Sequence, residues 1–155
     1  MGGEIQVAVI MGSESDRETM EACLGQLEKL GVKSELKVSS AHRMPDQTKA
    51  YIEEAVERGA KVFIAGAGMS AALPGYVASV TMKPVIGVPI PSGLPSGMDA
   101  LLSMVQMPPG IPVATVAIGK AGAKNAAVLA TEILALVDDS FTKELQKMRD
   151  QWKSR

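Results

Sequence analysis

The chain has 155 residues, of which 46% are hydrophobic and 21% charged, and its 16 basic side chains nearly balance its 17 acidic ones. This length predicts one domain, and the near-neutral charge excludes the basic surface typical of nucleic-acid-binding proteins. Cys23 and His42 are the only residues of their types, which excludes an intrachain disulfide and metal sites built from several cysteines or histidines. No apolar run reaches the roughly 18 residues that cross a bilayer, and no basic segment precedes a hydrophobic one. We therefore expect a cytoplasmic protein without nucleic-acid or membrane partners.

Short runs rich in valine and isoleucine predict buried strands at Val7–Met11, Val62–Ala65, Val85–Ile90 and Val113–Ile118. Because these runs are apolar almost throughout, both faces of the sheet should be covered, as they are in parallel sheets. The segment Glu35–Ser39 instead alternates polar with apolar residues, which predicts an edge strand. The sequence thus predicts five strands in one parallel sheet.

Helical patterns separate the predicted strands. Ser15 with Glu18 predicts a capping box for the first helix. A later stretch, Ala123–Val137, is apolar almost all round, so we expect a neighbouring subunit to cover part of it. The charged segment from Asp138 to Arg155 predicts a separate C-terminal helix. Strands alternating with helices predict an α/β fold with a doubly wound parallel sheet in three layers.

In such sheets, ligands bind beyond the carboxyl ends of the strands. The segments that follow the predicted strands are 12–16, 39–43, 66–75, 89–97 and 119–125, and they hold the histidine and many of the serines and glycines. The connections at the opposite rim are ordinary turns. We therefore expect the functional site at the carboxyl-end rim.

Two of these segments carry candidate chemistry. The turn Gly12–Asp16 opens a helix, so its N–H groups and hydroxyls can hold a phosphate, while Asp16 suits a ribose hydroxyl. A helix cap that binds nothing is the alternative. Histidine is the residue type suited to acid/base work near neutral pH, and His42 stands next to Arg43, a permanent cation that can hold phosphate; a structural histidine is the alternative here. Together these residues indicate a nucleoside monophosphate site with one acid/base.

The segment Gly66–Ala71 fits a loose form of the dinucleotide-binding fingerprint. No acidic residue lies between Glu57 and Asp99, where that fingerprint needs one for the ribose, which argues against NAD. The segment can line a small apolar pocket, or its glycines can simply let helix and strand pack closely. Lys120 is a candidate phosphate ligand, although Ala121 after it rules out a Walker A motif.

Four motifs in the chain resemble the PurE family of purine biosynthesis: Met11–Asp16, Ser40–Pro45, Gly66–Gly75 and Gln106–Ala127. The resemblance implies a flavodoxin-like fold, a homo-octamer, and neither a metal ion nor an organic cofactor. It also implies one catalytic domain over 1–155, with a core at about 5–137 and a C-terminal helix at about 138–155.

The resemblance also implies a substrate and residue roles. PurE mutases convert N5-carboxyaminoimidazole ribonucleotide to 4-carboxyaminoimidazole ribonucleotide by decarboxylation and recarboxylation at ring carbon 4. By resemblance, His42 is the catalytic acid/base, Ser13 and Arg43 bind phosphate, and Asp16 binds ribose. A separate ATP-dependent carboxylase is then expected to supply the substrate. The remaining expected substrate-binding residues are Gly12, Ser15, Ser40, Ala41, Gly66, Ala67, Gly68, Ser70, Ala72, Leu73 and Lys120.

One loop departs from the mutase pattern. Microbial mutases usually carry a histidine where this chain has Ala72. A second PurE class, which carboxylates aminoimidazole ribonucleotide (AIR) directly with carbon dioxide, lacks this histidine and has a serine in the loop, as Ser70 is here. The sequence therefore favours a mutase, with AIR carboxylase as the alternative. A non-catalytic mononucleotide- or flavin-binding module is the second alternative, since flavodoxin-like folds host many functions.

Overall fold

The computed structural model describes residues 3–153. Its centre is a five-stranded sheet in the order β2-β1-β3-β4-β5, in which every pair of neighbouring strands is parallel. This is the strand order of flavodoxin-like doubly wound proteins, so the predicted fold class is confirmed. The strands are β1 (Val7–Met11), β2 (Ser34–Val38), β3 (Val62–Gly68), β4 (Val85–Ile90) and β5 (Ala114–Thr115).

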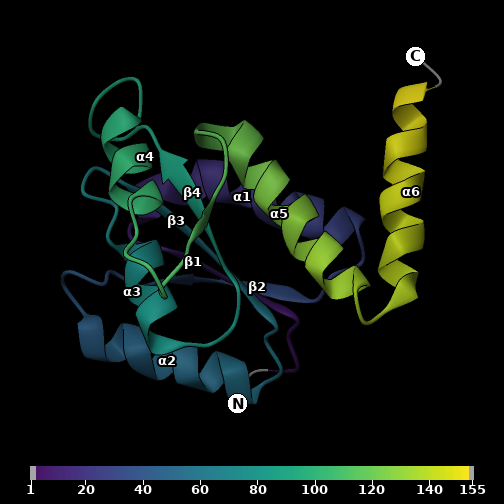
Figure 1. The fold of residues 1–155 in the computed structure, drawn as a ribbon, viewed down its shortest axis with the longest axis horizontal. Helices are drawn as coiled ribbons and strands as arrows, with labels where there is room; N and C mark the ends of the chain where they lie inside the picture. Colours follow the sequence, from purple (N-terminus) through teal and green to yellow (C-terminus); the bar gives the residue numbers. More distant parts are fainter. Residues whose placement is uncertain (1–2, 154–155) are drawn as a thin grey trace.

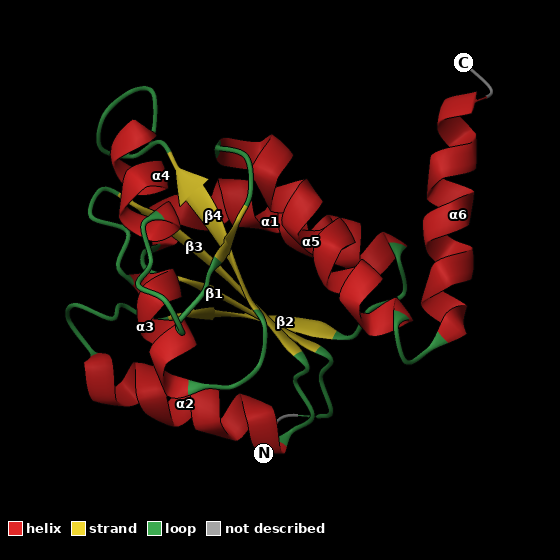
Figure 2. Ribbon diagram, viewed as in Figure 1, coloured by secondary structure: helices red, strands yellow, loops and turns green. Residues whose placement is uncertain are grey.

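Helices cover both faces of the sheet and make three layers (Figure 1). Helices α1 and α5 lie on one face, and α2, α3 and α4 lie on the other. The secondary-structure view shows that every crossover between successive parallel strands contains a helix (Figure 2). The helices are the 3₁₀ turn η1 (Glu14–Asp16), α1 (Arg17–Lys29), α2 (Pro45–Glu57), α3 (Leu73–Val80), α4 (Met98–Val105), α5 (Gly119–Ala135) and α6 (Asp139–Lys153).

The continuous apolar runs follow from this layering. In β1, Val7, Val9 and Met11 pack into the cluster with α1 and α5, whereas Ala8 and Ile10 pack into the cluster on the other face. Successive side chains of a strand point to opposite faces, so a strand between two helical layers must be apolar at every position. All five of these β1 residues are fully buried.

Three predicted strands have other limits in the structure, and one of these differences has consequences for the site. The edge strand predicted at Glu35–Ser39 lies one residue earlier, at Ser34–Val38. The third strand was expected to end at Ala65, but β3 continues to Gly68, because Gly66 pairs with both neighbouring strands. The last strand is shorter than expected: only Ala114 and Thr115 pair with β4. β5 is an edge strand, and β4 is its single neighbour.

The predicted capping box was also wrong. Ser13, rather than Ser15, caps the chain at this point, and its hydroxyl accepts a hydrogen bond from the Ser15 N–H at 3.3 Å. Glu18 points elsewhere and bonds to Lys120. The short turn η1 before α1 moves the cap two residues earlier than the sequence pattern indicated.

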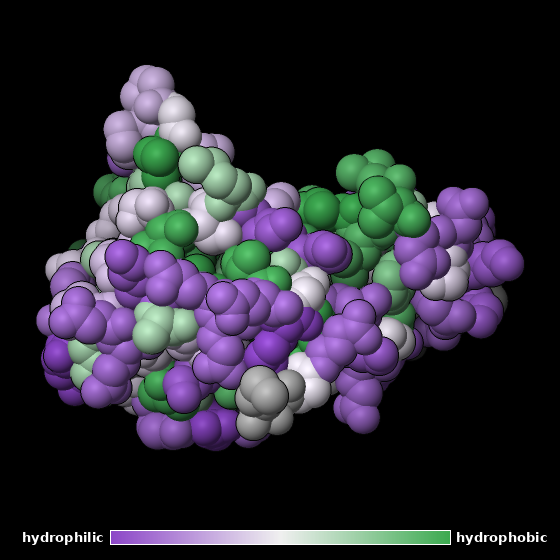
Figure 3. All heavy atoms as spheres, turned by 90° about the horizontal axis from the view of Figure 1, so that it is seen from below, coloured by the Kyte–Doolittle hydropathy of each residue, from purple (hydrophilic) through white to green (hydrophobic). Residues whose placement is uncertain are grey.

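Helix α6 stands apart from the layered body (Figure 1). It contacts α5 through its buried side chains Phe141 and Leu145, as expected for a separate C-terminal helix. Leu136 and Val137, in the turn that joins the two helices, are 82% and 86% exposed. Figure 3 shows hydrophobic surface where the body meets this helix. Within residues 3–153, no helix is both long and apolar enough to cross a membrane.

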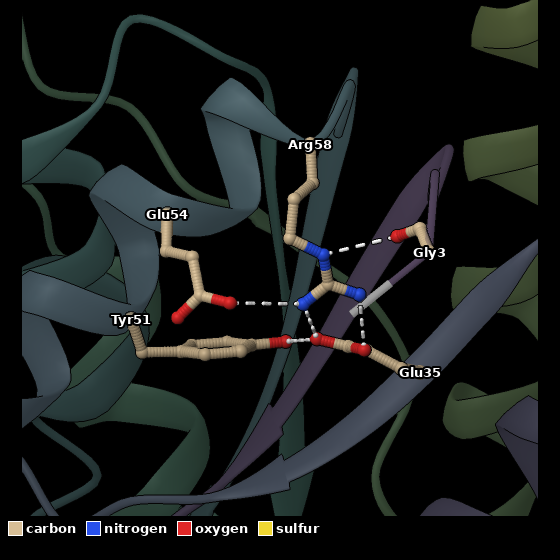
Figure 4. Close-up of polar contacts among 5 residues, drawn as sticks. All are labelled: Gly3, Glu35, Tyr51, Glu54 and Arg58. Atoms are coloured by element: carbon tan, nitrogen blue, oxygen red, sulfur yellow. Dashed lines mark hydrogen bonds and ion pairs between the residues drawn. The ribbon is translucent and has the colours of Figure 1, made fainter. Parts of the chain in front are cut away.

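A polar cluster fixes the opposite, amino-terminal end of the sheet (Figure 4). The Arg58 guanidinium donates to both carboxylate oxygens of Glu35, at 2.8 and 2.6 Å, and Tyr51 donates to the same carboxylate at 2.9 Å. Arg58 also contacts Glu54 and donates to the Gly3 carbonyl. The cluster ties the end of α2 to the edge strand β2, away from the rim where the site was expected.

Candidate active site

A cavity of about 530 Å³ opens at the carboxyl-end rim of the sheet. It lies beyond the carboxyl end of β1 and its two neighbours, β2 and β3. These strands lie on opposite sides of β1, so the direction of strand order reverses here. This is the topological switch point, the usual ligand site of open α/β sheets. The cavity is lined by Gly12, Ser13, Ser15, Asp16, Ser40, Ala41, His42, Arg43, Ala67, Gly68, Met69, Ser70, Ala71, Ala72, Leu73 and Ser92.

The turn after β1 supplies hydroxyls and one buried carboxylate. Ser15 donates to Ser13 from both its N–H and its hydroxyl, which holds the two side chains together at the cavity. Asp16 is only 4% exposed. Burial raises the pKa of the Asp16 carboxyl, and hydrogen bonding to Ser13 and Ser15 opposes this shift. A carboxyl with a perturbed pKa at the edge of a cavity is a typical candidate for ligand binding.

The loop after β2 presents the histidine and the arginine. Its base is anchored by buried groups: the Ser39 and Thr48 hydroxyls lie 2.6 Å apart, and Thr48 donates to the Met44 carbonyl. Above this anchor, His42 and Arg43 are exposed and line the cavity. The predicted acid/base and the predicted phosphate-binding cation therefore share one cavity with the serines of β1.

The loop after β3 closes the cavity with small side chains. Ala67 at the end of β3, Ala71 in the loop and Leu73 at the start of α3 are buried, and no charged residue lies between 67 and 73. Met69 and Ala71 have positive φ angles of 53° and 32°, which cost energy for residues other than glycine. Such strain is concentrated at functional sites, and here the two strained residues form a tight, weakly polar turn beside the cavity.

Thirteen of the fifteen residues expected at the site line the cavity, and Gly66 and Lys120 do not. Gly66 lies inside β3, where a Cβ would collide with the Met20 side chain of α1, so it permits close packing beneath the site. The Lys120 ammonium bonds to Glu18 at 2.5 Å instead of facing the cavity. Met69, Ala71 and Ser92 also line the cavity and were not predicted to do so, although all three belong to segments that follow predicted strands.

The fold and the cavity define a doubly wound α/β protein whose candidate site brings together one histidine, one arginine, one buried carboxylate and several serine hydroxyls. Within residues 3–153, no group of three or more His, Cys, Asp or Glu side chains could hold a metal ion. Residues 6–155 match the family described as AIR carboxylase. The chain belongs to this family of enzymes.

The chain is similar to N5-carboxyaminoimidazole ribonucleotide mutases from several organisms. It is 54% identical to the mutase of Bacillus subtilis over 95% of this chain and 91% of that one. It is 51% identical to the mutase of Escherichia coli over 96% and 85% of the two chains. Among solved structures, Treponema denticola PurE superposes with a TM-score of 0.86 at 30% identity, over 96% of this chain and 92% of that one.

Proposed function

We propose that this enzyme converts N5-carboxyaminoimidazole ribonucleotide to 4-carboxyaminoimidazole ribonucleotide. One observation supports this most: His42 and Arg43 share a cavity with Ser13 and Asp16, and the segment 67–73 lines it without any charged side chain. Ser13 and Arg43 would hold the phosphate, and Asp16 would accept hydrogen bonds from the ribose. His42 then remains to exchange protons with the aminoimidazole ring of the substrate.

The reaction needs two proton transfers that cancel. When the carbamate loses carbon dioxide, the pair of electrons from the broken N–C bond stays on nitrogen, which takes up one proton. When ring carbon 4 attacks the carbon dioxide, that carbon releases one proton to restore aromaticity. A single group that titrates near neutral pH can give the first proton and accept the second. His42 is the one histidine of the chain, and it faces the cavity.

The released carbon dioxide must remain beside carbon 4 until the new bond forms. Confinement turns this step into a reaction within one complex, which accounts for much of the acceleration that positioning can provide. Ala67, Ala71 and Leu73 are 6%, 3% and 3% exposed and form a weakly polar wall on the cavity. We assign the carbon dioxide to this wall.

The test separates chemistry from binding. His42→Asn removes the acid/base and leaves the phosphate ligands in place, so nucleotide affinity should stay within about tenfold of the wild type while turnover disappears. Arg43→Met is the matched contrast, because it should weaken binding of every phosphorylated ligand. Turnover near the wild-type rate in His42→Asn would refute the proposed role of His42.

AIR carboxylase is the second candidate, and the cavity contains the two residues that favour it. Ala72 and Ser70 both line the cavity. Purified protein should be given N5-carboxyaminoimidazole ribonucleotide in one assay and AIR with bicarbonate in another. Turnover of the second mixture alone would replace the mutase proposal by the carboxylase, a lyase. Absence of turnover in both would favour a binding module.

We also propose that the chain acts as one catalytic domain within a homo-octamer. Its support is apolar surface that the single chain leaves open: Leu136, Val137, and a groove of about 970 Å³ between α5 and α6 with Leu129 and Trp152 among its lining residues. A monomer has little reason to expose such surface. Sedimentation velocity at micromolar concentration should give one large species, and a monomer there would refute the assembly.

We further propose that the enzyme acts in the cytoplasm and that a separate enzyme supplies its substrate. The single thiol, Cys23, is buried and cannot form a disulfide within the chain, which suits the reducing cytoplasm. The substrate is an N-carboxylated amine, whose formation from bicarbonate requires activation, and a separate ATP-dependent carboxylase would provide it. Adding such a carboxylase with ATP to the purified protein and AIR should raise the yield of 4-carboxyaminoimidazole ribonucleotide at low bicarbonate.

A further inference from the structure

Ser92 is a polar residue that lines the cavity, and the reaction proposed above assigns no role to it. It comes from the loop 91–97, which follows β4 and leads into α4. Its side chain lines the cavity together with His42. Within the described part of the chain, the Ser92 hydroxyl has no hydrogen-bond partner of its own. A hydroxyl in this position can donate to a bound ligand.

The sheet register explains how Ser92 reaches the cavity. Gly68, at the end of β3, pairs with Ile90, the last residue of β4. Two residues later, the Ser92 N–H donates to the Ile90 carbonyl at 2.9 Å, which turns the chain back toward β3. The Ser92 hydroxyl then occupies the place that a Cβ of Gly68 would take. The missing side chain at Gly68 thus makes the space in which this hydroxyl lies.

Asp99, in the first turn of α4, holds the loop in place. Its Oδ2 accepts a hydrogen bond from the Leu94 N–H at 3.0 Å and lies directly against Gly93. These are the two residues that follow Ser92. Its Oδ1 is buried and has no hydrogen-bond partner among residues 3–153. Within residues 3–153, the bond from the Leu94 N–H is therefore the only hydrogen bond that this carboxylate accepts.

The position of Ser92 along the rim indicates which part of a ligand it meets. The predicted phosphate and ribose ligands come from the loops after β1 and β2, and the apolar wall comes from the loop after β3. Ser92 comes from β4, the next strand along, which lies about 5 Å farther on at the usual strand spacing. A ribonucleotide held at β1 and β2 therefore directs its base, and the carboxyl group on that base, toward Ser92.

We propose that Ser92 donates a hydrogen bond to the carboxyl group that moves during the reaction, and that Asp99 is a positioning residue that holds Ser92 over Gly68. This inference rests on the proposed function, because it requires a carboxylated aminoimidazole ribonucleotide in the cavity. It makes Ser92 a residue that distinguishes carboxylated from uncarboxylated nucleotide.

Binding is measured by calorimetry in protein that carries His42→Asn, so that neither nucleotide reacts. In this background Ser92→Ala should weaken binding of 4-carboxyaminoimidazole ribonucleotide by about 10- to 100-fold, the effect of losing one hydrogen bond to a charged group. Affinity for AIR, which lacks the carboxyl group, should stay within about twofold. Ser79→Ala on α3, an exposed serine outside the cavity, is the matched control and should change neither affinity.

The role of Asp99 is tested by combining variants. The affinity ratio is the affinity for 4-carboxyaminoimidazole ribonucleotide divided by the affinity for AIR. Asp99→Ala should lower this ratio, and adding it to Ser92→Ala should lower the ratio no further, because Asp99 acts through Ser92. Asp99→Asn keeps an oxygen for the Leu94 N–H and should preserve most of the ratio. Additive effects of Asp99→Ala and Ser92→Ala would overturn the positioning role.

The remaining outcomes separate this inference from the function beneath it. If Ser92→Ala leaves the affinity ratio unchanged, or weakens both nucleotides equally, Ser92 only shapes the cavity and the inference is wrong while the function stands. If the wild type turns over neither nucleotide and the His42→Asn protein binds neither, the proposed function fails and this inference fails with it.

Discussion

Gly66 gives the sharpest test of how the site is supported from below. A methyl group added by Gly66→Ala would meet Met20 Sδ, with Met20 Cγ and Cε at 3.0 Å. All three atoms belong to one flexible but fully buried side chain, so Met20 must be displaced within a closed core. Gly66 does not line the cavity, so the substitution should act on stability rather than directly on ligand binding.

The size of the effect follows from two opposing contributions. Overpacking of a core costs about 1–3 kcal/mol, whereas replacing glycine by alanine in an extended segment restricts the unfolded chain and returns about 0.4–1 kcal/mol. We therefore expect Gly66→Ala to destabilise the fold by about 1–2 kcal/mol. Met20→Ala alone leaves a cavity and should cost about 3 kcal/mol, within the usual range for buried methionine.

The double variant decides between packing and other causes. In Gly66→Ala with Met20→Ala, the new methyl group enters space that Met20 has left, so the pair should be no less stable than Met20→Ala alone. The double variant should then be about 1–2 kcal/mol more stable than the sum of the two single effects would make it. Urea unfolding followed by far-ultraviolet circular dichroism, at one fixed protein concentration, measures all three free energies. Simple additivity of the two single effects would refute the packing role assigned to Gly66.

Two further predictions concern titratable groups away from the cavity. Burial raises the pKa of the Cys23 thiol to about 12, so at pH 8 only about one thiol in ten thousand is ionised. A thiol reagent should therefore label Cys23 only after unfolding. Rapid labelling of the folded protein would contradict this prediction. The hydrogen bonds from Arg58 lower the pKa of Glu35, so their contribution to stability is complete above the pKa of an unfolded glutamate and is lost as pH falls through the lower folded value. Arg58→Met should therefore make the loss of stability in acid less steep, as measured by urea midpoints between pH 6 and pH 3, and an unchanged slope would argue against this pairing.

The layers of the fold follow from local patterns in the sequence. Runs such as Val7–Met11 and Val85–Ile90 are apolar almost throughout, and a strand of this kind is stable only between two helical layers. The rim that carries the candidate site could also be predicted, because all parallel strands end at the same edge and the polar segments follow those ends. His42, Arg43, Ser13 and Asp16 could be placed together on this basis, and one cavity contains them all.

Which residues of these segments reach the cavity depends on how the strands and helices pack. Gly66 pairs with Met11 and Val88 inside the sheet, so the strand ends three residues later than its apolar pattern indicates and Gly66 remains beneath the site. Lys120 bonds to Glu18, a residue 102 positions away, and a sequence pattern carries no information on such a contact. Ser92 reaches the cavity because β4 lies beside β3 and Gly68 leaves space for its hydroxyl. Local periodicity sets the faces of strands and helices, whereas a site at the rim depends on strand order and register, which chain segments far apart establish only when they pack.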